Sequence, residues 1–103
     1  MTTDRGTQLA ALLFKQLGHE SRLQIVRLLA EHPRSVGALT EATGLSQPLV
    51  SQHLRTLRQT HLVTVERIGR EAVYSLADAH VAHVVEDAVA HVLHHQHNPE
   101  ETS

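Results

Sequence analysis

Two short amphipathic segments joined through Gly44 constrain the fold of this chain more than any other feature. The first covers residues 36–43; Ser35 can cap its start, and Gly44 can end it in a left-handed turn. The second begins after Ser46 and carries Pro48 in its first turn, where a missing N–H costs nothing. Two helices connected by a tight glycine turn predict a helix-turn-helix.

The second of these helices has an apolar face and a polar one. Val50, Leu54 and Leu57 recur at helical spacing and are expected to face the core. Other side chains can bond to base edges or to phosphates, and we regard these as candidate DNA contacts: Ser46, Gln47, Ser51, Gln52, His53, Arg55 and Arg58. For this segment alone, a solvated amphipathic helix is the alternative interpretation.

A β-hairpin is expected directly after the helix-turn-helix. Residues 62–67 alternate and are β-branched, and after a turn a second strand is expected at residues 72–76. Such a hairpin is a wing, and Arg67 and Arg70 near its tip would reach flanking phosphates or a minor groove. From the second helix to the hairpin tip there are four arginines and one glutamate, in a chain whose net charge is −2. This local excess is typical of a surface that binds a phosphate backbone.

Periodic leucines predict two more helices ahead of this region, at residues 7–17 and 21–30, and Pro33 ends the second. A last helix is expected at residues 78–97. The 103 residues therefore predict a single domain, 1–103, that is mainly α with a small β-hairpin. Its fold would be a winged helix-turn-helix in the order α-α-α-α-β-β-α, and so short a chain would gain buried core by forming a homodimer.

The expected last helix, residues 78–97, concentrates the histidines of the chain, since six of the ten lie in it. At 100° per residue its valines form an apolar stripe, which we expect to pack against other helices. A polar stripe beside it carries His80, Asp87, His91 and His94.

These polar residues and Asp78 form two candidate metal half-sites. Asp78 and His80 lie at the start of the helix, and His91 and His94 are an i,i+3 pair near its end. The eleven-residue step from His80 to His91 spans roughly 16 Å, so one helix cannot close the set around one ion. Two antiparallel copies in a C2 dimer can, and three nitrogens with one oxygen suit zinc or cobalt, or nickel with added ligands. A solvated surface helix with scattered histidines is the alternative.

Composition excludes several other classes of protein. The absence of cysteine rules out disulfides and thiolate sites, which disfavours soft metal ions. No apolar run reaches about 18 residues and no charged-then-apolar leader is present, so we expect a cytoplasmic protein without a membrane span. No nucleophile, phosphate loop or separate general base accompanies the histidines, and an enzyme is not expected.

The residues of the helix-turn-helix and wing resemble the ArsR/SmtB family of metal-sensing winged-helix repressors. The resemblance covers about residues 9–94 and is carried by Gly44-Leu45-Ser46-Gln47, Val50-Ser51-Gln52-His53-Leu54, Leu57-Arg58 and Leu62-Val63. Its most specific part is Asp78-x-His80 followed by His91-x-x-His94, which matches the terminal-helix metal site of the zinc- and cobalt-sensing branch. The family's other metal site, a Cys-x-Cys type, is missing because residues 36–43 contain no thiol.

The resemblance implies a homodimer that holds double-stranded operator DNA of inverted-repeat type without metal and releases it when metal binds across the paired final helices. It also implies a relay, in which metal-bound His91 hydrogen-bonds to a backbone carbonyl near the end of the recognition helix, at the position of His61. His83 and His97 lie outside the four family ligands, and with His95 they leave nickel open as the inducer. A winged-helix regulator that does not respond to metal is the remaining alternative.

Overall fold

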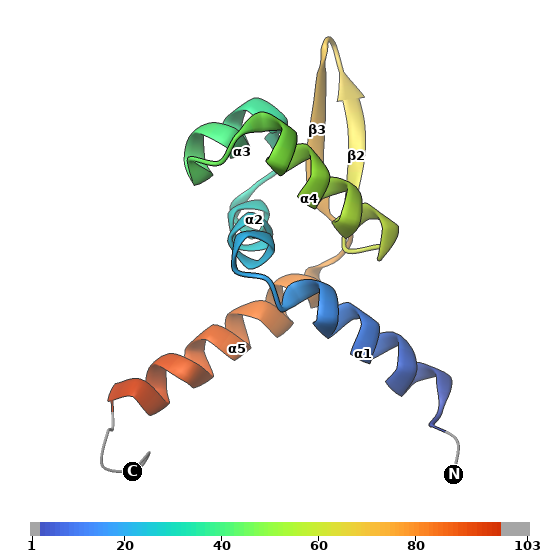
Figure 1. Cartoon of the computed structure of the whole chain (residues 1–103), viewed down its shortest axis with the longest axis vertical. Helices are drawn as coiled ribbons and strands as arrows, with labels where there is room; N and C mark the ends of the chain where they lie inside the picture. The colour runs from blue at the N-terminus through green and yellow to red at the C-terminus, as the bar shows by residue number, and fades with distance from the viewer. Residues whose placement is uncertain (1–2, 98–103) are drawn as a thin grey trace.

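The computed structural model describes residues 3–97, except that the side chain of His97 lies outside the described part. The elements run in the order α1 (Arg5–Leu17), α2 (Glu20–Glu31), β1 (Arg34–Ser35), α3 (Val36–Thr43), α4 (Gln47–Gln59), β2 (Val63–Ile68), β3 (Glu71–Leu76) and α5 (Ala79–His97). The predicted order of four helices, a hairpin and a last helix is confirmed, and the fold is a winged helix-turn-helix (Figure 1).

The core lies in the body of the molecule, which we define as α2, α3, α4 and the three strands. Ile25 of α2 and Leu39 of α3 have no exposed surface, and neither have Val50, Leu54 and Leu57 on the inner face of α4. Burying a leucine or isoleucine side chain stabilises a fold by about 1.5–3 kcal/mol. The apolar stripe predicted for α4 is therefore confirmed, and it fixes the opposite face of α4 toward solvent.

The turn between α3 and α4 has the predicted chemistry. Ser35 caps α3 by accepting the backbone N–H of Ala38 at 3.1 Å, and Gly44 ends α3 with a φ of 75°. Ser46 caps α4, and its hydroxyl oxygen accepts the backbone N–H of Leu49 at 3.4 Å. The Ser46 hydroxyl is thus engaged by the start of its own helix, which limits its freedom to contact DNA.

The end of α4 is closed by two backbone hydrogen bonds. The N–H of Leu62 donates to the carbonyl of Leu57 at 2.9 Å, and the N–H of His61 donates to that of Arg58 at 3.0 Å. This is the Schellman arrangement, in which the residue after the helix adopts a left-handed conformation that glycine usually supplies. His61 fills that position with a φ of 60°, at a cost of about 1–2 kcal/mol relative to glycine.

The wing is the predicted hairpin of β2 and β3, which pair antiparallel along their whole length. Its two-residue turn contains Gly69 with a φ of 64°. The sequence pattern did not predict β1, whose Arg34 pairs with Tyr74 of β3 to make a three-stranded sheet in the order β1-β3-β2. A strand of two residues has no alternation by which a pattern could find it.

The arms, defined as α1 and α5, diverge at the end of the molecule opposite the wing (Figure 1). Val81 and Val85 near the start of α5 are buried, whereas Val92 further along is 60% exposed. On α1, Phe14 is 56% exposed. The arms therefore carry apolar surface that one chain leaves uncovered. Within residues 3–97, no helix is both long enough and apolar enough to span a bilayer.

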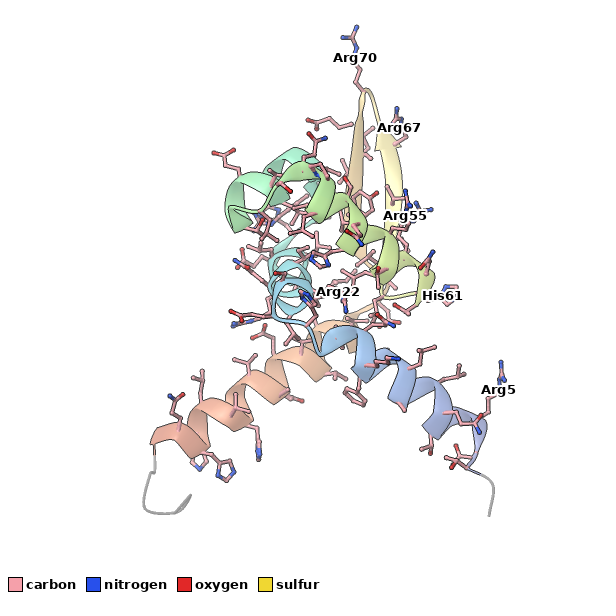
Figure 2. The ribbon with its side chains drawn as sticks, in the orientation of Figure 1. Arg5, Arg22, Arg55, His61, Arg67 and Arg70 are labelled. Carbon is pink, nitrogen blue, oxygen red and sulfur yellow. The ribbon has the colours of Figure 1, made fainter. Side chains whose placement is uncertain are left out.

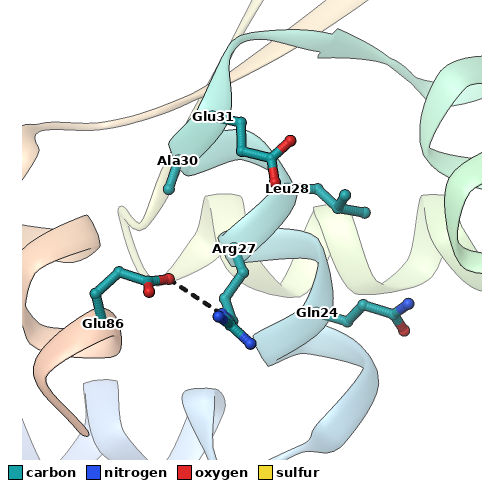
Figure 3. Close-up of a pocket in the computed structure, with 6 residues that line it drawn as sticks. All are labelled: Gln24, Arg27, Leu28, Ala30, Glu31 and Glu86. Carbon is teal, nitrogen blue, oxygen red and sulfur yellow. Dashed lines mark hydrogen bonds and ion pairs between the residues drawn. The ribbon is translucent and has the colours of Figure 1, made fainter. Parts of the chain in front are cut away.

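An ion pair joins α5 to the body. Arg27 Nε of α2 lies 3.0 Å from Glu86 Oε1 of α5, in an open groove of about 500 Å³ that Gln24 and Leu28 also line (Figure 3). Both charged side chains are 49% exposed. Because exposed ion pairs contribute little, the start of α5 is held mainly by its buried valines.

Candidate DNA-binding surface and metal half-sites

The outer face of α4 carries the polar side chains expected to read base edges. Gln47, Ser51 and Gln52 are exposed along it, and Arg55 and Arg58 are exposed toward its end. Figure 2 shows Arg55 directed outward on the side of α4 where the wing lies. Amide and hydroxyl groups on such a helix can bond to bases in a major groove, while arginines can bond to bases or phosphates.

The wing adds two cations to this surface. Arg67 is exposed on β2, and Arg70 is exposed in the hairpin turn. In Figure 2, Arg70 extends beyond the tip of the wing and Arg67 lies just below it. The two side chains can therefore contact phosphates that flank the bases facing α4.

His53 does not belong to this surface, and its prediction as a DNA contact is wrong for this conformation. Its side chain is only 5% exposed, on the inner face of α4. Its ring centroid lies 4.7 Å from that of His19, and its Nδ1 lies 3.5 Å from Arg22 Nη1. Burial, followed by the charges of His19 and Arg22, lowers the pKa of His53 below its usual value. The sequence carried the signal, since Val50, His53, Leu54 and Leu57 follow the i, i+3, i+4, i+7 spacing of a core face.

The first candidate metal half-site lies at the start of α5. Asp78 Oδ1 is 3.4 Å from His80 Nδ1, and the side chains are 57% and 95% exposed respectively. The same carboxylate oxygen accepts the backbone N–H groups of His80 at 2.9 Å and Val81 at 3.3 Å, so Asp78 caps the start of the helix. The structure thus brings a carboxylate and an imidazole together on open surface.

The second candidate half-site lies near the end of α5. His91 and His94 are both exposed, and the ring centroid of His95 lies 4.4 Å from that of His91 and 5.8 Å from that of His94. His83, earlier on the helix, is also exposed, and the side chain of His97 falls outside the described residues. Three imidazoles therefore gather at this end of the helix.

One chain does not unite the two half-sites. Among residues 3–97, no three His, Asp or Glu side chains are placed to hold one ion. This agrees with the roughly 16 Å of helix expected between His80 and His91. A complete four-ligand site therefore requires a second source of ligands.

His61 lies beside the first half-site. A pocket of about 160 Å³ is lined by His61 at the end of α4, by Asp78 and His80 at the start of α5, and by leucines and valines of both arms and the turn. In Figure 2, His61 projects from the end of α4. His91 of the same chain is far along α5, so the structure brings His61 to the Asp78 and His80 half-site and not to its own His91.

Comparison with known proteins shows which family and which proteins this chain resembles. Residues 19–65 match the family described as bacterial regulatory protein, arsR family. The HTH-type transcriptional repressor SmtB of Mycobacterium tuberculosis is 50% identical over 82 residues, which are 80% of this chain and 61% of that protein. The HTH-type transcriptional regulator NmtR of the same species is 40% identical over 94 residues, covering 91% of this chain and 78% of that protein. This chain thus spans about three-fifths of the SmtB relative.

A solved structure has the same architecture. The homodimeric winged helix-turn-helix DNA-binding domain of a possible ArsR-family transcriptional regulator from Mycobacterium bovis superposes with a TM-score of 0.79 at 31% identity. The superposition covers 94% of this chain and 92% of that domain. The agreement therefore extends over nearly the whole fold, arms included.

Proposed function

Because the chain belongs to the ArsR family of bacterial regulatory proteins, we propose that it is a metal-responsive transcriptional repressor. Its homodimer binds operator DNA of inverted-repeat type without metal and leaves that DNA when zinc or cobalt binds. The observation that carries the metal response is the division of ligands between the two ends of α5. Neither end has enough ligands for an ion, and their chemistry is complementary.

The exposed face of α4 and the wing support the DNA-binding part. Three neutral polar side chains face outward along the first half of α4, and arginines follow on α4 and on the wing. The chain as a whole has a net charge of −2, so this surface concentrates the positive charge where a duplex would lie. A homodimer would carry two such surfaces, as an operator with two half-sites requires.

The surface of the arms supports a dimer that completes the metal sites. Phe14 on α1, and Val92 and Leu93 on α5, expose apolar area that a second copy would bury. In an antiparallel pair of α5 helices, Asp78 and His80 of one protomer would face His91 and His94 of the other. Three imidazoles and one carboxylate are a donor set that zinc and cobalt accept.

The pocket beside His61 supports a route from metal to DNA. If His91 of the partner subunit reaches Asp78 and His80, it enters the neighbourhood of His61 at the end of α4. A hydrogen bond from that imidazole to the His61 carbonyl would connect an occupied site to the recognition helix. The metal would then favour a dimer in which the two α4 helices no longer match the operator.

One observation favours a second candidate, in which nickel is the inducer. His95 packs its ring against His91 and lies close to His94, so a further imidazole is at hand for a higher coordination number. His83 and His97 are the other candidates for extra ligands. Loss of a nickel response, but not of a zinc response, on changing His95→Ala would support this alternative.

The test is fluorescence anisotropy of the protein on a labelled duplex from upstream of its own gene, at fixed salt because salt dominates such affinities. We expect tight binding without metal, release by about one zinc per chain, and recovery with a chelator. Failure to bind any such duplex would refute the repressor, whereas binding that ignores zinc, cobalt and nickel would refute only the metal response.

Variants separate the two parts of the proposal. His91→Gln and His94→Ala are expected to bind the operator as the parent does but to lose release by zinc. The matched control is His32→Ala, which removes an exposed histidine outside α5 and should leave the response intact. A His94→Ala protein that still releases DNA on adding zinc would remove His94 from the site.

A further inference from the structure

Three cationic or protonatable side chains meet between the recognition helix and α2. His19 caps the start of α2, Arg22 lies in its first turn, and His53 faces them from the inner side of α4. His53 was predicted to contact DNA, but its burial removes it from the DNA-binding surface, and His19 and Arg22 lie outside both that surface and the metal half-sites. Figure 2 places Arg22 between α2 and α4, far from the wing and from the end of α5.

The contact of His53 with Arg22 requires a neutral His53 ring. Nδ1 of His19 accepts the backbone N–H of Ser21 at 3.2 Å and so caps the start of α2. A guanidinium only donates, so His53 Nδ1, at 3.5 Å from Arg22 Nη1, must be the acceptor and carry no proton. Protonation of His53 would set an N–H against the guanidinium of Arg22.

Arg22 cannot easily move away from His53. Its Nε donates to the carbonyl of Gln16 at 2.7 Å, a carbonyl in the last turn of α1 that has no partner within its own helix. Arg22 therefore ties the end of α1, the start of α2 and the inner face of α4 to one another. A positive charge on His53 would repel a cation that is held in place.

We propose that His19, Arg22 and His53 position the recognition helix against α2, and that protonation of His53 weakens operator binding by separating the two helices. The proposal rests on the proposed DNA-binding function and adds proton sensitivity to it. It concerns the metal-free protein, since none of the three residues belongs to the candidate metal half-sites.

Among the described residues 3–97, no carboxylate contributes to the pKa shift of His53. The elements packed on α4 are α2, α3 and β2, and the charged groups that act on His53 are His19 and Arg22. Glu41 of α3 and Glu66 of β2 are exposed, and neither is among the groups that shift the pKa of His53. Burial and the charges of His19 and Arg22 hold the pKa of His53 below its usual value. The folded protein therefore favours the neutral form of this ring, which predominates at neutral pH.

Operator binding measured with chelator present, from about pH 7.5 to about pH 5.5 at constant ionic strength, tests the proposal. The parent protein is expected to lose affinity on acidification by roughly fivefold or more, within a limit of about tenfold per pH unit for each coupled proton. A loss of affinity on acidification distinguishes this effect from a general charge effect. Protonating exposed histidines adds positive charge and would by itself strengthen DNA binding.

Variants assign the effect to the cluster. His53→Asn keeps an acceptor near the Nδ1 position and cannot be protonated, so it should bind like the parent at about pH 7.5 and lose the acid response. His53→Leu lacks the acceptor and should bind more weakly at every pH. His32→Asn, at an exposed histidine outside the cluster, is the matched control and should respond to acid as the parent does. Equal acid responses in the parent and His53→Asn would overturn the proposal.

An NMR titration of the free protein tests the positioning role of the cluster without DNA. A negative result would therefore refute this role without bearing on the proposed repressor function. Protonation of the His53 ring should coincide with shifts of amide signals in α2 and α4. Urea unfolding should also show a contribution of the neutral His53 ring to the free energy of unfolding. This contribution should be complete above about pH 6.5, the usual pKa of histidine in an unfolded chain, and should be lost as the pH falls below that value. The reason is that the unfolded chain binds the proton more readily than the folded one. Titration of His53 without change in α2 and α4 would refute the positioning role even if His53→Asn misfolds.

Discussion

The body of this molecule buries its apolar side chains within one chain, whereas the arms leave many of theirs exposed. In the body, Ile25 and Leu39 have no exposed surface, whereas in the arms Phe14 is 56% and Val92 60% exposed. The candidate DNA contacts lie on the body and the candidate metal ligands lie on one arm. The candidate DNA-binding surface is therefore complete within one chain, whereas the proposed metal site would need ligands from a second chain.

This difference predicts the largest effect in the chain. Leu54→Ala, in the fully buried face of α4, should destabilise the protein by about 2–5 kcal/mol, because the cavity lies in a core that cannot collapse. Leu12→Ala removes the same atoms from an arm residue that is 47% exposed, and should cost far less in the monomer. Urea unfolding at several protein concentrations measures both. If Leu12→Ala destabilises the protein as much as Leu54→Ala at the lowest protein concentration, the arms are already packed within one chain and the contrast with the body is wrong.

The same contrast explains what sequence could predict. Helix bounds, caps and the inner face of α4 follow from local spacing, and Ser35 and Gly44 act as predicted. The ends of α5 could be assigned as half-sites because a helix fixes the distance along its own axis. The contact of His53 with Arg22 joins residues 31 positions apart, and no local pattern encodes which helix an inner histidine will meet.

A smaller effect is expected at the tip of the wing. Arg70→Ala should weaken operator binding by about 1.5–3 kcal/mol, the range of a hydrogen bond to a charged group, with no dependence on sequence. It should also lower the salt slope by about one for each protomer, as loss of a phosphate contact does. Anisotropy titrations at several salt concentrations give both quantities. Arg5→Ala, on an arm, is the control and should leave the slope unchanged.

The end of α4 lies where the body meets the arms. A substitution there is expected to stabilise the protein, whereas the others weaken folding or binding. His61→Gly removes a side chain held at a φ of 60° and should stabilise the protein by about 1 kcal/mol, provided the imidazole makes no compensating contact. Since the proposed relay uses the backbone carbonyl, release of DNA by zinc should persist in this variant. Thermal unfolding and the zinc titration measure the two outcomes. Loss of the zinc response with normal stability would move the relay from the carbonyl to the imidazole.

The smallest effect is expected at the ion pair between body and arm. Glu86→Gln breaks the contact with Arg27, yet both side chains are 49% exposed and solvent screens them, so the loss in stability should stay below about 1 kcal/mol. Val85→Ala, one residue away on the buried side of α5, should cost more than Glu86→Gln because it removes packed apolar surface. If the order of the two is reversed in urea unfolding, charge rather than apolar burial holds the arm to the body, and salt would then loosen α5 as well as the DNA complex.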